Sequence, residues 1–224
     1  MATRTTIWSL EVRESPMFRD PSRDCPLCPR LVAFHADNRA AHPDWHNAPV
    51  PAFGPLDARL LIVGLAPGLK GANRTGRPFT GDYAGDLLYA TLLKFGLAKG
   101  SYDQRADDGL SLQDCRITNA VRCVPPQNKP TPAEAKTCGK FLKDEINSLK
   151  KLASILALGR ISHEATLRAL GLKTGTYPFG HAKIHDLPSG IRLVDSYHCS
   201  RYNTQTNRLT VSMFEDAVEA AAKR

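Results

Sequence analysis

Residues 60–86 read LLIVGLAPGLKGANRTGRPFTGDYAGD, and this stretch is the most informative for the fold class. Its apolar start predicts a buried strand that ends at Gly64. A long, glycine-rich loop follows over residues 65–83, before helix-like sequence resumes near Ala84. Such loops at the carboxyl ends of buried strands bind ligands in open α/β sheets, whereas the alternative is a connector without a function. We expect a ligand loop.

The charges of this loop indicate the kind of ligand. The loop has neither the Gly-Lys-Ser/Thr of a Walker A motif nor the GxGxxG spacing of a dinucleotide site. Lys70, Arg74 and Arg77 could contact phosphates. Either Asp82 or Asp86 could then take part in catalysis. This composition fits a nucleotide or nucleic-acid substrate.

Strand-like and helix-like segments alternate along the chain, which predicts a parallel sheet covered by helices on both faces. The TPAE sequence at residues 131–134 predicts a helix start with an N-cap, a proline at the first helical position and a capping-box glutamate. We expect a polar loop with a possible turn over residues 97–114, a polar loop over 198–207, and a loop over 172–189 that could include a hairpin edge. The expected strands cover residues 59–64, 115–121, 153–158 and 191–197, and the expected helices 28–40, 84–95, 132–149, 161–170 and 209–222.

The chain has 224 residues, enough for one α/β domain with a proper core. We therefore expect a single domain over residues 1–224, with an irregular segment at residues 1–22. No apolar run reaches the length of a membrane span, and the first residues lack the hydrophobic core of a signal peptide, which predicts a cytoplasmic protein. The net charge of +8 favours a polyanionic partner.

Four of the six cysteines are placed as metal ligands could be. Cys25 and Cys28 enclose a two-residue gap that lets both thiolates reach one metal centre. With Cys123 and Cys138 they could close a structural zinc site or an iron–sulfur cluster. The alternative for the latter pair is burial in the core. Cys115 lies inside an expected strand and is interpreted as a packing residue.

Three polar residues lie on or beside loops that follow expected strands, namely Asn119, His198 and Asn203. Because the carboxyl ends of parallel strands meet along one rim, these side chains can converge on one pocket. Each also has a purely structural explanation, such as a hydrogen bond to nearby backbone. Their combination with the glycine loop and the spaced cysteines favours a site.

Five blocks of the chain occur in the order found in a known family. The blocks are Cys25-x-x-Cys28, GLAPG at 64–68, GANRTGRPFTGD at 71–82, ITNAVRC at 117–123 with PTPAEAKTC at 130–138, and HCSRYNTQTNRLT at 198–210. On these blocks the chain, from about residue 23 to residue 220, resembles the uracil-DNA glycosylase superfamily, specifically its type-B (family 5) iron–sulfur branch.

The resemblance implies a three-layer α/β/α sandwich with a central four-stranded parallel sheet. It also implies a [4Fe–4S] cluster held by Cys25, Cys28, Cys123 and Cys138. Such a cluster would be structural, because it would tie the amino-terminal segment to the helix after the second strand.

The resemblance also implies a pocket for a base that is flipped out of the DNA. Phe79 would stack on that base, and Asn119 would pair with the edge of uracil. His198 would stabilise the charge that the leaving base gains, and Asn203 would hold the second-motif loop. Gly64, Leu65 and Ala66 would complete the pocket, and Arg74, Arg77, Arg201 and Arg208 would contact DNA, with a solvated surface as the alternative for the last two.

The first motif departs from the best-known branches of the family, which carry there an acid or amide that positions the attacking water. Leu65 and Ala66 fill that region here, which is typical of the type-B branch. We expect Asp82 to act instead, with Asp86 as the second candidate. Either could cap the helix that starts near Ala84, and for Asp86 capping is favoured.

Cys199 is a second departure, because the motif commonly has proline at this position. Loss of proline frees φ and adds a backbone N–H beside His198, so we expect a modest change in loop stiffness.

The sequence therefore predicts a monomeric, monofunctional DNA glycosylase that excises uracil, and other deaminated bases such as hypoxanthine, from double-stranded DNA and leaves an abasic site. Monofunctional chemistry is predicted because the sequence shows no evident lysine nucleophile, and Lys70 is the only lysine in the first-motif loop. One alternative is a non-catalytic protein that binds deaminated-base damage. Another is a redox iron–sulfur protein whose pocket is incidental.

Overall fold

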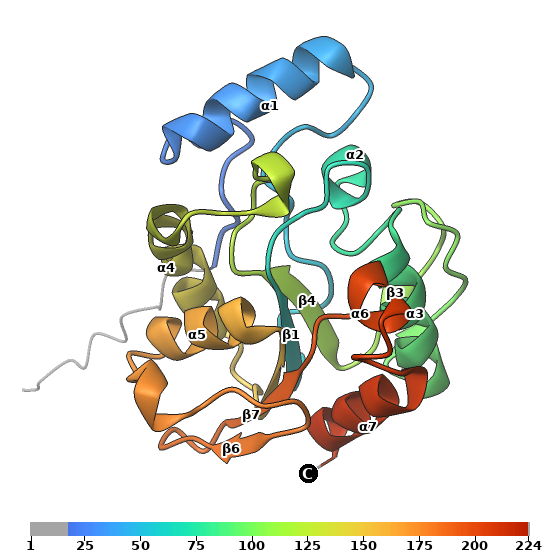
Figure 1. Cartoon of the computed structure of the whole chain (residues 1–224), viewed down its shortest axis with the longest axis vertical. Helices are drawn as coiled ribbons and strands as arrows, with labels where there is room; N and C mark the ends of the chain where they lie inside the picture. Colours follow the sequence, from blue (N-terminus) through green and yellow to red (C-terminus); the bar gives the residue numbers. More distant parts are fainter. Residues whose placement is uncertain (1–17, 224) are drawn as a thin grey trace, which may run out of the picture.

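The computed structural model describes residues 18–223, so most of the expected irregular segment at residues 1–22 lies outside the described residues. A central sheet lies between helices on its two sides (Figure 1). Among residues 18–223, no helix combines the length and the hydropathy that crossing a membrane requires.

The central sheet has five strands in the order β4-β1-β5-β7-β6. The first four in this order are parallel, and Gly64 at the end of β1 lies opposite Asn119 at the end of β4. Because the strand ends are aligned, the loops after β1, β4 and β7 leave the sheet at one rim. The strands are β1 (Leu60–Gly64), β4 (Cys115–Asn119), β5 (Ser154–Leu158), β6 (Ile184–Asp186) and β7 (Arg192–Ser196).

The outer strand β6 corrects the expectation of a four-stranded, purely parallel sheet. It pairs antiparallel with β7, so that Ile184 lies opposite Val194 and Asp186 opposite Arg192. The sheet is therefore mixed. The hairpin edge that the sequence allowed within residues 172–189 is formed by β6 with β7. The sequence could not establish this strand, because its three residues are too few to show an alternating pattern.

The side chains of β1 alternate between two apolar cores, one on each face of the sheet. Leu60 and Ile62 pack on the side of α3 and α7, whereas Leu61 and Val63 pack on the side of α4 and α5. Figure 1 shows these two helix layers on opposite sides of the strands. The α/β sandwich is thus confirmed. The layers consist of α3 (Tyr83–Lys94), α4 (Pro132–Ser148), α5 (Arg160–Ala169) and α7 (Val211–Ala222).

The start of α4 is a capping box, as the sequence predicts. The Thr131 hydroxyl accepts the Glu134 N–H at 3.2 Å, and the Glu134 carboxylate accepts the Thr131 N–H at 2.7 Å. The same carboxylate accepts from Arg30 of α1 (Pro29–Ala41) at 2.7 Å. One glutamate therefore starts α4 and also links it to α1.

Two short helices lie in segments that the sequence indicated only as loops. α2 (Ala72–Thr75) interrupts the glycine loop, and α6 (Arg201–Gln205) lies inside the expected polar loop over 198–207. Helices of four and five residues are too short to show an apolar period. The remaining elements are the hairpin of β2 (Ala98–Lys99) and β3 (Ser111–Leu112) and 3₁₀ turns at Pro126–Asn128 and Thr174–Thr176.

A buried network of charges joins β4 to α4. The Glu145 carboxylate accepts from Arg116 at 2.6 Å and from Arg122 at 2.5 Å, and all three side chains are buried. Arg122 also pairs with Asp20 at 2.5 Å. Two buried guanidinium groups need the carboxylate between them, because an uncompensated charge in the interior is costly.

We predict that Glu145→Gln lowers the free energy of unfolding by about 3–5 kcal/mol, because it leaves the buried Arg116 without a compensating charge and leaves Arg122 with Asp20 alone. Denaturant titration measures this loss. Asp144→Asn, at the exposed neighbouring position, is the matched control and should change stability by less than about 0.5 kcal/mol. Equal losses in the two variants would contradict the prediction.

Candidate active site and cysteine pocket

A pocket opens at the rim where the parallel strands end. Its walls come from the loops after β1, β4 and β7, so segments that are distant in sequence meet there. The structure brings Phe79, Asp82, Asn119 and His198 together in this pocket. The other lining residues are Leu65, Ala66, Pro67, Gly68, Ala72, Tyr83, Ala84, Asn128, Ser200 and Arg201.

Gly64 makes room for two of these side chains. A Cβ atom at position 64 would lie 2.3 Å from Oδ1 of Asn119 and 2.6 Å from Cζ of Phe79, both well inside contact distance. Asn119 is 2% exposed and Phe79 is 7% exposed, so neither can easily move away. The pocket therefore requires glycine at the end of β1.

Asn119 holds an unpaired hydrogen-bond acceptor inside the protein. Its Oδ1 atom is buried and has no hydrogen-bond partner among the described residues. Leaving such an acceptor unpaired costs about 1–3 kcal/mol, which a bound N–H group would recover. The amide also carries two N–H donors, so Asn119 can offer one acceptor and one donor to the same ligand.

Phe79 lies in a strained backbone conformation beside this amide. Its φ of +53° falls in the left-handed region, which phenylalanine seldom adopts. The hydroxyl of Tyr89 donates to the Pro78 carbonyl at 2.6 Å, and the hydroxyl of Tyr102 donates to the Phe79 carbonyl at 3.2 Å. These bonds hold the turn that presents the Phe79 ring, whose centroid lies 5.9 Å from that of His198.

The helix α6 fixes the backbone of His198. The side-chain N–H of Asn203 donates to the His198 carbonyl at 2.8 Å, and Ser200 caps α6 by accepting the Asn203 N–H. Asn203 thus holds the loop after β7 without lining the pocket itself. Desolvation of the half-buried His198 ring in the pocket wall lowers its pKa to about 4, so the ring is neutral near pH 7.

Asp82 caps a helix and lines the pocket at the same time. Its carboxylate accepts the Gly85 N–H at 3.2 Å and so caps α3. A Cβ atom at Gly68 or Gly71 would lie 2.9 Å or 2.4 Å from its Oδ2, so these glycines let the loop close around the carboxylate. Burial raises the pKa of Asp82, which makes its ionised form a stronger proton acceptor.

The expectation that Asp86 caps this helix is wrong. Asp86 lies in the first turn of α3, where it is exposed and accepts a hydrogen bond from Gln104 at 2.7 Å. The helix starts at Tyr83, one residue before the expected start, so the capping position falls on Asp82.

Comparison with known proteins identifies the family. Residues 51–222 match the family model described as Uracil DNA glycosylase superfamily. The chain belongs to this superfamily. A Type-5 uracil-DNA glycosylase of Thermus thermophilus is 46% identical over 205 residues, which are 89% of this chain and 93% of that protein. Proteins of the same name from Mycobacterium tuberculosis and Pyrobaculum aerophilum are 43% and 37% identical, over 89% of this chain and 77% and 88% of theirs. The resemblance to the type-5 branch is confirmed.

The first motif of this uracil DNA glycosylase family member brings no acid to the pocket. Leu65 and Ala66 line the pocket with apolar side chains. The carbonyls of Gly64 and Leu65 accept the N–H groups of Ala120 and Val121, each at 2.9 Å, so this backbone is fixed against the segment after β4. Among the described residues that line the pocket, only Asp82 carries a carboxylate.

Arg77 does not lie where the sequence predicted a DNA contact. It is 4% exposed, and its guanidinium forms two hydrogen bonds of 2.7 Å with the carboxylate of Asp108. This pairing holds the pKa of Asp108 well below its usual range. Because the Arg77 charge is already paired inside the protein, it is not available to a phosphate group.

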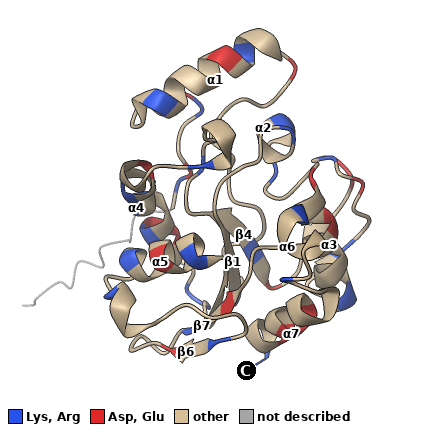
Figure 2. Cartoon of the chain, viewed as in Figure 1, with Lys and Arg blue, Asp and Glu red and all other residues tan. Residues whose placement is uncertain are grey.

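The other three predicted DNA-contacting arginines lie at the surface. Arg201 lines the pocket, with its guanidinium 5.3 Å from the ring centre of Tyr83. Arg74 is exposed on α2, and Arg208 is exposed over the ring of Tyr197 at 4.6 Å. Figure 2 shows basic residues on both α2 and α6, beside the loops that form the pocket.

Sequence reasoning missed two residues near the pocket. Asn128 lines it from the 3₁₀ turn after β4. Tyr202 follows Arg201 in α6 and is 70% exposed. The sequence shows Tyr202 as an aromatic residue inside a polar segment, which could have indicated it. Its exposure could not be predicted, because it depends on how α6 packs against the rest of the protein.

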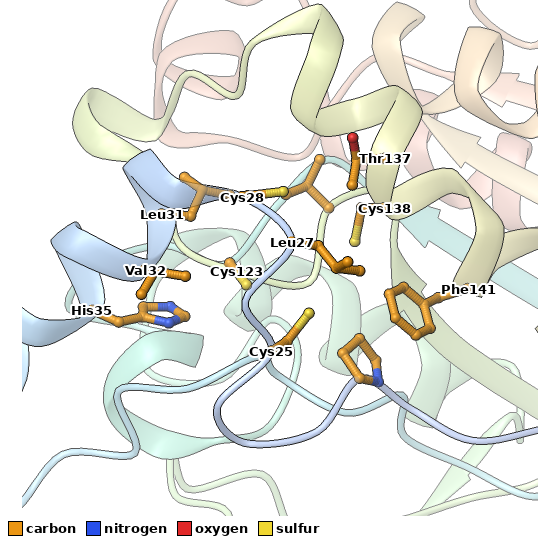
Figure 3. Close-up of a pocket in the computed structure, with 12 residues that line it drawn as sticks. Cys25, Leu27, Cys28, Leu31, Val32, His35, Cys123, Thr137, Cys138 and Phe141 are labelled. Carbon is orange, nitrogen blue, oxygen red and sulfur yellow. The ribbon is translucent and has the colours of Figure 1, made fainter.

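Cys25, Cys28, Cys123 and Cys138 line a second pocket, between α1 and α4 (Figure 3). The first two precede α1, the third follows β4, and the fourth lies in α4. The backbone N–H of Arg122 donates to the sulfur of Cys138 at 3.3 Å. The apolar wall of this pocket consists of Pro21, Leu27, Leu31, Val32, Val121 and Phe141.

The four sulfur atoms are too widely spaced for one zinc ion. A tetrahedral zinc with bonds of about 2.3 Å would bring its thiolates to within about 3.8 Å of one another. Among the described residues, no three of these sulfurs lie within 4.8 Å of one another. Burial raises the pKa of Cys123 and Cys138, so their thiolates would need bound cations to be stable.

The other two cysteines lie outside this pocket. Cys115 is fully buried in β4, in a packing position. Cys199 is also fully buried, and its thiol donates to the Ala84 carbonyl at 3.4 Å, which links the loop after β7 to α3.

Elsewhere in the protein, two histidines are joined to one aspartate by hydrogen bonds. Nδ1 of His163 lies 2.6 Å from Asp195, and Nε2 of His185 lies 3.1 Å from the same carboxylate. Ligands of one metal, bound at about 2.0–2.2 Å, would be farther apart than 2.6 Å. These hydrogen bonds therefore join α5, β6 and β7 rather than prepare a metal site.

We predict that the His198 ring stays neutral until the pH falls to about 4. The unfolded chain takes up this proton near pH 6.5, so acidification between these two values lowers stability. An NMR titration of the ring measures its pKa, with His198→Gln used to assign the signal. A midpoint near 6.5 would contradict the predicted desolvation of the ring.

Proposed function

We propose that this protein removes uracil from DNA by hydrolysing the bond between the base and the deoxyribose, which leaves an abasic site. The observation that carries this proposal is the unpartnered Oδ1 of Asn119, buried beside Phe79 in the pocket at the strand ends. The relatives that cover most of the chain are named uracil-DNA glycosylases, which supports the same substrate here.

The pocket offers groups that match the edge and the face of uracil. The imide N–H of uracil can donate to Oδ1 of Asn119, while the amide N–H of Asn119 donates to the adjacent carbonyl. Stacking of the base on Phe79 adds about 1–3 kcal/mol. A base inside the duplex cannot reach these groups, so it must be flipped out of the stack.

His198 can stabilise the leaving base. When the C1′–N1 bond breaks, its electron pair stays on uracil, and a carbonyl oxygen gains negative charge. A neutral imidazole donates a hydrogen bond to that oxygen and keeps its proton, in the manner of an oxyanion hole. The low pKa of the ring, about 4, favours this role over that of a general acid.

Asp82 can activate the water that replaces the base. The water oxygen bonds to C1′, which is electron-deficient once the base departs, and the water proton moves to the carboxylate. The raised pKa of Asp82 suits a proton acceptor. Among the described residues that line the pocket, none is a lysine, which supports hydrolysis without a Schiff base.

We further propose that the substrate is double-stranded DNA. Arg74, Arg201 and Arg208 can contact phosphates around the pocket, and the net charge of +8 adds long-range attraction. The exposed ring of Tyr202 can enter the stack in place of the flipped base, as apolar wedges do in other DNA-binding proteins. Hypoxanthine presents the same adjacent N–H and carbonyl as uracil, so we propose it as a second substrate.

We also propose that Cys25, Cys28, Cys123 and Cys138 hold a [4Fe–4S] cluster. The open spacing of their sulfurs and the N–H group on the sulfur of Cys138 support this assignment over zinc. When bound, the cluster supplies coordinate bonds that cross-link the segment before α1 to α4. The base pocket has its own lining residues, and its Ala66 packs against the apolar cluster that includes Leu31 and Cys138 of the cysteine pocket.

The apolar first motif, Leu65 and Ala66, favours one alternative function. A protein without an acid at that position could bind deaminated bases without cleaving them. The experiment below separates the two functions, because it measures binding and cleavage on the same oligonucleotide.

We predict that the protein generates abasic sites in a duplex that contains uracil, and that Asn119→Ala slows excision about 10- to 100-fold through loss of the base-pairing amide. Single-turnover cleavage of a labelled duplex measures both rates. Thr118→Val is the matched control, because it removes a neighbouring buried hydroxyl that also has no partner. Binding without abasic product would establish the non-catalytic alternative.

We predict that Asp82→Asn lowers the excision rate about 10²- to 10⁴-fold, because asparagine cannot accept the water proton. The substitution keeps an oxygen that can cap α3, so stability should change little. The control is Asp86→Asn in the first turn of α3, which should excise at the normal rate. An unchanged rate in Asp82→Asn would show that excision proceeds without a carboxylate base.

A further inference from the structure

We infer that His35 donates a hydrogen bond from Nε2 to a sulfur atom of the cluster and thereby raises its reduction potential. The inference rests on the iron–sulfur cluster proposed above. It gives a role to a histidine that the excision chemistry does not use.

His35 belongs to the wall of the cysteine pocket. It lies on α1, on the same side as Leu31, and both residues line the pocket. Figure 3 shows its ring directed from α1 toward Cys123 and Cys25. The residue is 6% exposed, and its Nε2 atom is buried without a hydrogen-bond partner among residues 18–223.

An unpaired imidazole nitrogen in this position requires a partner that the protein itself does not supply. Leu31, Val32 and Val121 on the pocket wall have no polar side-chain atoms. The inorganic sulfides and thiolates of a cluster accept hydrogen bonds and cannot donate them. A cluster in the pocket would therefore select the tautomer that carries its proton on Nε2, and would satisfy that nitrogen.

A hydrogen bond of this kind changes the energy of reduction. One electron that enters the cluster adds negative charge to its sulfur atoms, while the proton stays on Nε2. An N–H donor stabilises the more negative state more strongly, so the reduction potential rises. The backbone N–H of Arg122 on the sulfur of Cys138 acts in the same direction.

The apolar wall makes the contribution of His35 larger. Leu31 and Val121 are buried in this wall and limit the access of water, which would otherwise supply competing donors. Of the described residues that line the pocket, His35 is the only histidine. Its substitution therefore removes one donor and leaves the cysteine ligands unchanged.

The first test compares the wild-type protein with His35→Phe and His35→Gln, all purified without oxygen. Iron and acid-labile sulfide are measured first, because a wild-type protein without iron would refute the proposed cluster itself. Spectroelectrochemical titration of the loaded proteins then gives their midpoint potentials. We expect a more negative potential in His35→Phe, which keeps a ring without an N–H, and a value near wild type in His35→Gln, which keeps a donor.

His42→Phe at the end of the same helix is the matched control, because His42 is exposed and does not line the pocket. Its potential should equal that of the wild type. Equal potentials in the wild type and in His35→Phe would overturn the inference.

A second measurement does not depend on whether the variants fold. Pulsed EPR of the reduced wild-type protein, labelled with ¹⁵N-histidine, should show a ¹⁵N coupling to the cluster. Absence of this coupling would also overturn the inference, while leaving the cluster and the excision activity in place.

Discussion

Asn119 and Phe79 approach each other across Gly64, where the absence of a Cβ atom leaves the space they occupy. The pocket depends on this close approach. It also depends on the parallel register, which puts Gly64 opposite Asn119 at the ends of β1 and β4. A register shift of one residue would turn the Asn119 side chain to the other face of the sheet. The sheet therefore determines whether the base-pairing amide and the stacking ring can meet.

The loop after β1 combines stability and function in the same residues. Asp82 caps α3 and also presents its carboxylate to the pocket. Phe79 keeps its left-handed backbone because Tyr89 and Tyr102 hold the carbonyls of this turn. Gly85 permits the same turn, since a Cβ atom there would lie 1.8 Å from the Phe79 carbonyl oxygen. A well-packed helix start thus fixes both a candidate catalytic carboxylate and a stacking ring.

The segment that contains α1 is held by ion pairs, by packing of Leu31 against Val121 and Cys138, and by a bridge from Phe53 to Ile117 of β4. Figure 1 shows α1 apart from the strands, at one end of the molecule. Arg30 pairs with Glu134 of α4, and Arg122 pairs with both Asp20 and Glu145. The cysteine pocket joins the same two helices. A cluster at that position would strengthen a connection that the ion pairs already make.

Much of the order of elements could be read from local signals in the sequence. The apolar run of β1, the capping box at Thr131 and the cysteine spacing each involve neighbouring residues, so they need no knowledge of the fold. By itself the sequence indicated the alternation of strands and helices, the family, and four side chains that meet in the pocket, those of Phe79, Asp82, Asn119 and His198. Only the tertiary structure decided that Arg77 is paired with Asp108 in the interior, that β6 adds an antiparallel edge and that Asp82 caps α3. Those features depend on contacts between distant residues, or on segments too short to show a periodic pattern.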